Sequence, residues 1–245
     1  MKATRLGTGF AVAVRRVRLR AAVLVVVMLT VFCMAPHAAG AAAAARWRNG
    51  QVITFTPGDW GGRTGCCVAS TALGLLFATF DTLYIGSSVE IGLPGTAGFS
   101  DRFFDALSVN LYLGSFGAPA ALSADRIDPA LDEDGSGMFG TNVLALKLNV
   151  DFTDAGLIVG ALPLRFGDLR LCNLGQIGQL GGTALLNGLS VRQVLAIANT
   201  LLGGGTVGGG VTALTIADAA VVIEGLNSSF GGGLVTEFAQ EHLCR

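Results

Sequence analysis

The residues best placed to do chemistry are acidic and lie near the middle of the chain. Asp132, Asp134 and Ser136 occupy alternate positions and are followed by Gly137, as at the start of an EF-hand calcium loop. The twelfth position of such a loop should be a bidentate glutamate, and here it is Val143. The pattern therefore allows calcium binding only of the weak kind found in extracellular modules, and a solvated acidic loop is the simpler interpretation.

Paired carboxylates are the second possibility, because glycosidases need only two acids at a suitable separation. Asp59 stands beside Trp60, as an acid next to a sugar-binding platform would, and Asp81 or Glu90 would be its partner. A turn aspartate beside a core tryptophan is the simpler interpretation, and we favour it. We therefore assign no catalytic residue.

Histidine chemistry and phosphate binding find little support. Of the two histidines, His37 lies in an N-terminal segment expected to be removed, and His242 lies near the C-terminus, where a solvated side chain is expected. A Ser-His-Asp triad or a histidine-rich metal site is therefore not predicted. The glycine runs at 203–210 and 231–233 lack the lysine and hydroxyl residues of a phosphate-binding loop, so they are interpreted as hinges.

Residues 1–45 have the order of a secretory signal peptide. Residues 1–20 contain six lysine and arginine residues and no acid, an apolar run follows at 21–35, and small residues occupy 38–45. A membrane anchor would need about 20 apolar residues, and this run is shorter. The sequence therefore predicts an exported protein that is secreted or held at the cell surface.

Cleavage is expected between Ala39 and Ala45, which leaves a mature chain with no transmembrane span. The pair Arg15 and Arg16 leaves the export route open between the general pathway and the twin-arginine pathway.

Removal of this segment would make the chain acidic. It takes six of the 16 basic residues and none of the 17 acids, so the net charge falls to about −7. Without a basic cluster, nucleic-acid binding is not expected. The chain is also 51% hydrophobic and only 13% charged, so either the core is large or some apolar surface meets a partner or a second copy.

Four cysteines would remain, namely Cys66, Cys67, Cys172 and Cys244. An even number in an exported protein predicts disulfides. A bond between the neighbours Cys66 and Cys67 needs strained geometry, so we expect bonds from this pair to Cys172 and Cys244. A metal site is not expected, because the pair lacks the spacing of zinc ligands.

The pattern of elements predicts an α+β fold, with short N-terminal strands followed by a helix-rich region. Strands are expected at 52–56 and within 82–91, and Ser100 is expected to cap a helix carrying Phe103, Phe104, Leu107 and Leu111 on one face. Residues 144–152 alternate like a strand but also fit a helical stripe, and we interpret them as a helix ending near Asn149.

The C-terminal part predicts a helical hairpin over residues 187–245, packed on a domain at 46–186. A capping box at Ser190–Gln193 begins one helix, and Thr215 begins the other. Each helix is followed by three glycines. The pair resembles a dockerin in outline, but its loops lack the oxygen ligands for calcium, so calcium-dependent docking is not carried over.

Several sequence blocks resemble an uncharacterised group of secreted, often surface-associated bacterial proteins. The blocks are Asp59–Gly62, Val143–Phe152, Gly167–Cys172 and Asn187–Asn199, the last followed by Leu202–Gly205. They span roughly residues 50–230. The Cys66–Cys67 pair and the acidic segment Asp125–Asp134 are departures from the group. The resemblance implies an extracellular, non-catalytic role and transfers no site residues.

Three alternative functions are therefore compatible with the sequence. The first is a non-catalytic, disulfide-stabilised module that binds or builds a cell-surface or matrix component. The second is an envelope-associated protein that assembles with itself through apolar surface. The third is a carboxylate-dependent hydrolase.

Overall fold

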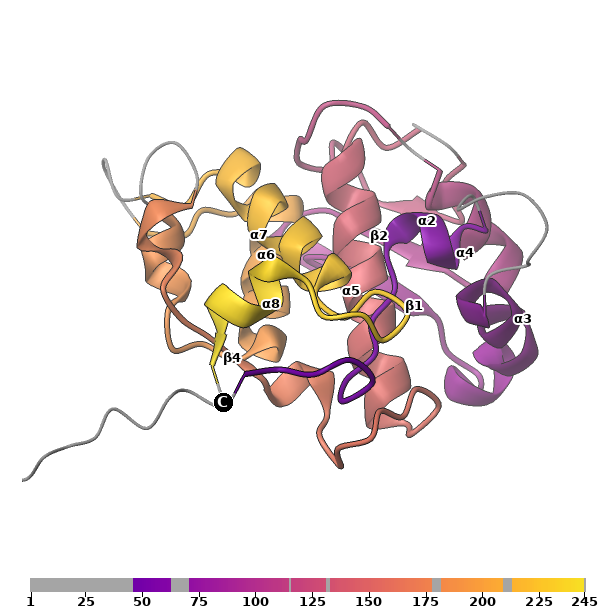
Figure 1. The fold of residues 1–245 in the computed structure, drawn as a ribbon. Helices are drawn as coiled ribbons and strands as arrows, with labels where there is room; N and C mark the ends of the chain where they lie inside the picture. Colours follow the sequence, from indigo (N-terminus) through magenta and orange to yellow (C-terminus); the bar gives the residue numbers. More distant parts are fainter. Residues whose placement is uncertain are drawn as a thin grey trace, which may run out of the picture. The chain divides into compact units, whose positions relative to one another are not determined.

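The computed structural model describes residues 46–62, 71–114, 116–130, 133–177, 182–208 and 213–244, and all of these belong to one compact unit, Ala44–Arg245. The expected signal peptide, the Cys66–Cys67 pair and Asp132 lie outside the described residues. The fold is α+β, as predicted, with helices around two small sheets (Figure 1).

One helix, α5 (Met138–Asp154), lies at the centre of this unit (Figure 1). Thirteen of its 17 residues are buried, and they occupy every side of the helix, as in a helix enclosed by other elements. Because apolar residues lie on all sides of this helix, its sequence has no single apolar face, and its pattern cannot be told from that of a strand by periodicity alone. The predicted helix at 144–152 is confirmed, but it continues to Asp154 rather than ending near Asn149.

The strand predicted at 52–56 is reduced to one β-bridge, between Thr54 and Gly231. Helix α2 (Pro57–Trp60) follows at once. Its capping box is reciprocal: the Asp59 N–H donates to Thr56 Oγ1 at 3.2 Å, and the Thr56 N–H donates to Asp59 Oδ2 at 2.9 Å. Local capping therefore competes successfully with the β propensity of the preceding residues.

The strand predicted within 82–91 is also shorter than expected. Helix α3 (Thr71–Leu83) includes its first residues, and β1 (Val89–Gly92) contains only its end. Strand β1 pairs antiparallel with β2 (Ser100–Phe103), which pairs in parallel with β3 (Arg126–Ile127).

Ser100 does not cap a helix, because it lies in β2. The helix begins later, as α4 (Ala106–Tyr112), and its cap is Asp105, whose carboxylate accepts a hydrogen bond from the Ser108 N–H at 2.8 Å. The predicted apolar face is mostly not buried. Phe103 is buried, but Phe104, Leu107 and Leu111 are about half exposed. Helix α4 packs inward through Val109 and Tyr112 instead.

The two C-terminal helices form as predicted. Helix α6 (Val191–Leu202) begins with the Ser190–Gln193 capping box and is followed by Gly203, while α7 (Ile216–Ser228) is capped by Thr215. Both helices pack on α5 as well as on each other, so residues 187–245 share the core of residues 46–186.

The chain then forms α8 (Glu237–His242) and β5 (Leu243–Cys244), which pairs antiparallel with β4 (Arg170–Leu171). Four short 3-10 helices complete the described elements: Gly95–Ala97, Phe166–Asp168, Leu174–Gln176 and Gly182–Leu186.

A disulfide joins Cys172 to Cys244 beside this two-stranded sheet. The expectation that both residues bond to the 66–67 segment is therefore wrong. Pairing of β4 with β5 brings the two Cα atoms to 5.9 Å, within the usual disulfide range, and the sequence alone does not indicate this pairing.

Candidate functional site

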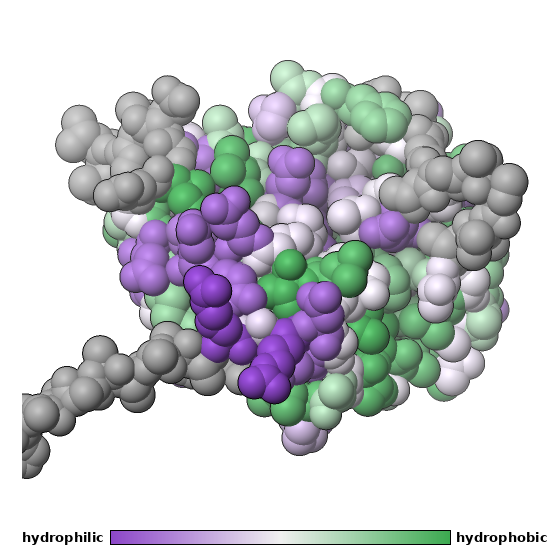
Figure 2. Space-filling model, in the orientation of Figure 1, coloured by the Kyte–Doolittle hydropathy of each residue, from purple (hydrophilic) through white to green (hydrophobic). Residues whose placement is uncertain are grey.

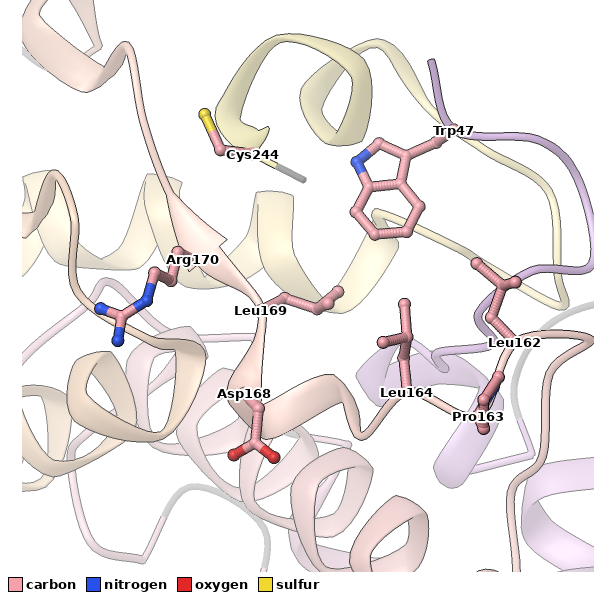
Figure 3. Close-up of a pocket in the computed structure, with 8 residues that line it drawn as sticks. All are labelled: Trp47, Leu162, Pro163, Leu164, Asp168, Leu169, Arg170 and Cys244. Carbon is pink, nitrogen blue, oxygen red and sulfur yellow. The ribbon is translucent and has the colours of Figure 1, made fainter. Parts of the chain in front are cut away.

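The candidate site is an apolar cavity of about 570 Å³ next to the disulfide (Figure 3). This volume lies in the range usual for small-molecule sites. Its lining comes from four separate segments, namely the N-terminal segment, the loop at 162–164, the segment at 168–170 and β5. The lining residues are Trp47, Leu162, Pro163, Leu164, Asp168, Leu169, Arg170 and Cys244.

Trp47 is held rigidly at one wall of the cavity. Its indole N–H donates to the Leu243 carbonyl at 2.8 Å, and its backbone N–H donates to Gln240 Oε1 at 3.1 Å. Its ring also meets Phe230 edge to face, with centroids 5.1 Å apart. The polar atom of the indole is therefore satisfied by the protein, and the residue, which is only 4% exposed, contributes apolar surface to the cavity wall.

The opposite wall is formed by residues 168–170, where the 3-10 helix Phe166–Asp168 ends and the chain becomes extended at Leu169. Leu169 and Leu164 point into the space beneath the indole, whereas Asp168 and Arg170 point away from it (Figure 3). The cavity therefore has apolar walls and a charged rim.

Both rim charges have partners. An Arg170 guanidinium N–H donates to the Gly188 carbonyl at 2.7 Å, and Asp168 pairs with Arg192 at 3.2 Å. Arg192 also forms two hydrogen bonds to Asp154, at 2.6 and 3.0 Å, which together with Asp168 raise the pKa of this arginine despite some burial. The rim is thus fixed by one ion pair and one hydrogen bond to the backbone.

The predicted glycosidase residues do not meet in a cleft. Trp60 is completely buried between Phe55 and Phe152, so it offers no platform to a sugar. Asp59 caps α2. Asp81 is exposed on α3, and Glu90 pairs with Arg102 at 3.0 Å.

Four cavities on the described part of the chain each contain a single carboxylate among their lining residues: Asp168, Glu224, Glu241 and Asp125. None of these four therefore holds the two acids that a glycosidase requires.

His242 is less solvated than expected, since only 13% of its side chain is exposed. The ring packs on Phe238 with centroids 5.0 Å apart, and Nδ1 lies 3.3 Å from the Cys172 carbonyl oxygen. Its side chain therefore helps to hold α8 beside the disulfide.

The predicted calcium ligands Asp134 and Ser136 are buried, not solvated. The Ser136 hydroxyl and the Tyr112 hydroxyl each donate to Asp134 Oδ2 at 2.5 Å. The third ligand, Asp132, lies outside the described residues, so the calcium site stays a prediction. Among the residues that the structure describes, no group of three or more His, Cys, Asp or Glu is arranged to hold a metal.

The sequence contains no signal for Trp47 as a site residue, because it follows the expected signal peptide and carries no motif. Its surroundings come from distant segments, which only the tertiary structure reveals.

The chain matches no family model, and no curated protein or solved structure is significantly similar to it. In the described part of the chain, no helix is long and apolar enough to span a bilayer.

Proposed function

We propose that this chain is an exported, non-catalytic binding module that recognises an apolar group on a cell-surface or matrix component. The observation that carries the proposal is the cavity beside Trp47, which has apolar walls and a charged rim held by the Asp168–Arg192 ion pair and by the hydrogen bond of Arg170 to Gly188. Export is supported by the N-terminal sequence, and the Cys172–Cys244 disulfide is compatible with an oxidising compartment. The resemblance to secreted bacterial proteins points the same way.

The ligand proposed for this cavity is an aromatic or acyl group carried by a surface polymer. Binding such a group against apolar walls is favourable, because it removes apolar surface from water. The polar remainder of the polymer would lie along the rim at Asp168 and Arg170.

Binding of the mature protein to cell-wall and matrix preparations tests the cavity. Leu164 is 44% exposed at its wall, so Leu164→Arg should weaken binding by about tenfold or more, as expected for a loss near 1.4 kcal/mol. Leu234, which is 64% exposed and lines none of the four cavities, gives the matched control Leu234→Arg. Equal binding by the two variants would contradict a role for this cavity.

Export is tested separately, by mass spectrometry of the non-reduced protein from the culture medium. Cleavage between Ala39 and Ala45 would support it, and an intact N-terminus retained inside the cell would refute it.

Self-assembly is the second candidate, and exposed apolar side chains on α3 and α4 support it. These two helices contact each other, and Phe77, Phe104, Leu107 and Leu111 on or beside them are each 48–55% exposed. In Figure 2, hydrophobic surface is visible on the side where α3 lies, while hydrophilic residues gather over α8. Such surface is typical of interaction sites.

Light scattering distinguishes this candidate from the first. Association should be lost in Leu107→Glu/Leu111→Glu and retained in the control Val159→Glu, whose valine is 68% exposed elsewhere. A homogeneous monomer at high concentration would count against self-assembly and leave the binding module as the proposal.

A further inference from the structure

A second cavity, of about 400 Å³, shares no lining residue with the one beside Trp47. Its walls come from the start of α2, the end of α4, the first turn of α5 and the C-terminal part of α7. Apolar surface is provided by Pro57, Met138 and Phe116, and Phe116 is 71% exposed. The cavity therefore has an apolar side that a ligand can reach.

Hydrogen bonds hold the walls of this cavity together. Asn227 Nδ2 on α7 donates to the Asn142 carbonyl on α5 at 3.0 Å, and Thr54 Oγ1 donates to the Asn227 carbonyl at 2.8 Å. The Met138 N–H donates to the Gly117 carbonyl at 2.9 Å, which holds the loop after α4 against α5. The cavity is therefore formed before any ligand arrives, as is usual for small-molecule sites.

Glu224 supplies the charge of this cavity. It is the one charged side chain among the described residues that line it, and it is exposed. No hydrogen bond or ion pair engages its carboxylate within the described part of the chain. Glu224 also lies near the C-terminal end of α7, where no basic residue offsets the negative end of the helix dipole. A cation bound here would relieve both negative charges.

Two half-buried hydroxyl groups in the lining present acceptors to a ligand, because each gives its proton to the protein. Ser228 Oγ donates to the Glu224 carbonyl oxygen at 3.0 Å, and Thr56 Oγ1 donates to Asp59 Oδ2 at 2.7 Å. Thr56 Oγ1 also accepts the Asp59 N–H at 3.2 Å. Since a hydroxyl oxygen has two lone pairs, each group keeps at least one for a donor in the cavity.

The positive ends of two helices also border the cavity, but they do not reverse its charge. The first N–H of α5, at Met138, is already engaged by the Gly117 carbonyl. Helix α2 is a single turn, and Asp59 within it already places a negative charge at that end. A helix end carries only about half a unit charge, whereas the carboxylate of Glu224 carries a full one.

We propose that this cavity binds a primary amine carried on an aliphatic stem, as in a lysine side chain or a small free amine. The ammonium group would lie between the Glu224 carboxylate and the hydroxyl oxygens of Thr56 and Ser228, which suit its three N–H donors. The stem would lie on Met138 and Phe116, and an aromatic ring also attracts a cation. A quaternary ammonium has no N–H donor and would leave these acceptors unpaired, so it fits less well.

Titration of the folded, disulfide-bonded protein, followed by amide nitrogen-15 NMR, tests the site. The probes are pentylamine, which is charged at neutral pH, and pentan-1-ol, which has the same stem without the charge. Pentylamine should bind about tenfold more tightly, as expected for charge-assisted hydrogen bonds, and should shift the amide signals of Glu224 and Ser228. Equal affinities would overturn the proposal, as would shifts beside Trp47 without shifts at Glu224 and Ser228.

A charge-removing variant tests the role of the carboxylate. Glu224→Gln keeps the shape of an exposed side chain, so the fold should be retained, while the affinity for pentylamine should fall by about tenfold and that for pentan-1-ol should not change. The matched control is Glu237→Gln, at an exposed acid on α8 that lines none of the four cavities. Equal pentylamine affinities in the two variants would overturn the proposal.

A third probe, N-acetyl-lysine amide, distinguishes the source of the amine. Tighter binding of this probe than of pentylamine would support a lysine side chain of a peptide, and weaker binding would support a free amine. Leu164→Arg, at the wall of the other cavity, should leave pentylamine binding unchanged, so the two sites can fail separately. Loss of amine binding in Leu164→Arg would place the amine beside Trp47 and overturn the proposal.

Discussion

Asn149 in α5 and Phe55 in the N-terminal segment are joined by two hydrogen bonds. The Phe55 N–H donates to Asn149 Oδ1 at 2.9 Å, and Asn149 Nδ2 donates to the Phe55 carbonyl at 2.7 Å. Asn149 Nδ2 also donates to Asn227 Oδ1 at 3.1 Å. One buried amide thus pairs with an extended segment as a neighbouring strand would, and links it to α7.

Replacement of this amide should therefore be costly. Asn149→Ala leaves the N–H and carbonyl of Phe55 buried without partners, and we expect a loss of about 2–3 kcal/mol of folding free energy. The control is Asn110→Ala in α4, which should change stability by less than about 0.5 kcal/mol. Denaturant unfolding measures both, and equal effects would contradict the pairing.

Two glycines in helices should respond oppositely to alanine. Gly140→Ala forces a methyl group into Ser136 and Tyr112 and should destabilise the fold by about 1–3 kcal/mol. At Gly74 in α3 a Cβ meets nothing within 4 Å, so Gly74→Ala should stabilise by up to about 1 kcal/mol through helix propensity. Thermal unfolding of the two variants checks the signs, and a stable Gly140→Ala protein would contradict the close approach.

The disulfide should stabilise the folded unit, because it closes a loop over a sequence separation of 72 residues. The double variant Cys172→Ser/Cys244→Ser should lose about 2–4 kcal/mol. Peptide mapping of the non-reduced wild-type protein should recover a peptide that joins Cys172 to Cys244. Recovery of either cysteine bonded to the 66–67 segment instead would refute this pairing.

The two tyrosines should resist ionisation while the protein is folded. Burial and the nearby charge of Asp151 raise the pKa of Tyr84, and burial and Asp134 raise that of Tyr112. Alkaline absorbance titration of the folded protein should show no tyrosinate at pH values where the unfolded chain titrates, near pH 10. Because the folded state retains these protons, its stability should fall as the pH rises above that value.

The elements predicted most accurately from the sequence are those marked by neighbouring residues, such as helix caps. Ser190 and Thr215 sit next to the helices that they cap, so their side-chain chemistry determines where α6 and α7 begin. The fold class followed from the same kind of evidence.

Ser100 shows why other predictions failed. Its apolar neighbours have helical spacing, yet its backbone N–H donates to Asp125, and its strand pairs with β1 and β3. These tertiary partners outweigh local propensity. The same applies to the site, since Trp47 is held by the Leu243 carbonyl, which lies 196 residues further along the chain.

The N-terminal and C-terminal segments of the described unit lie against each other (Figure 1). Trp47 bonds to Leu243, Gly50 to Gly233 and Thr54 to Phe230. During synthesis, the hydrogen bonds of the N-terminal segment can therefore form only after the C-terminal segment has been made. A nascent chain without residues 230–243 should be sensitive to proteases, and the fold should form in one late step of high contact order.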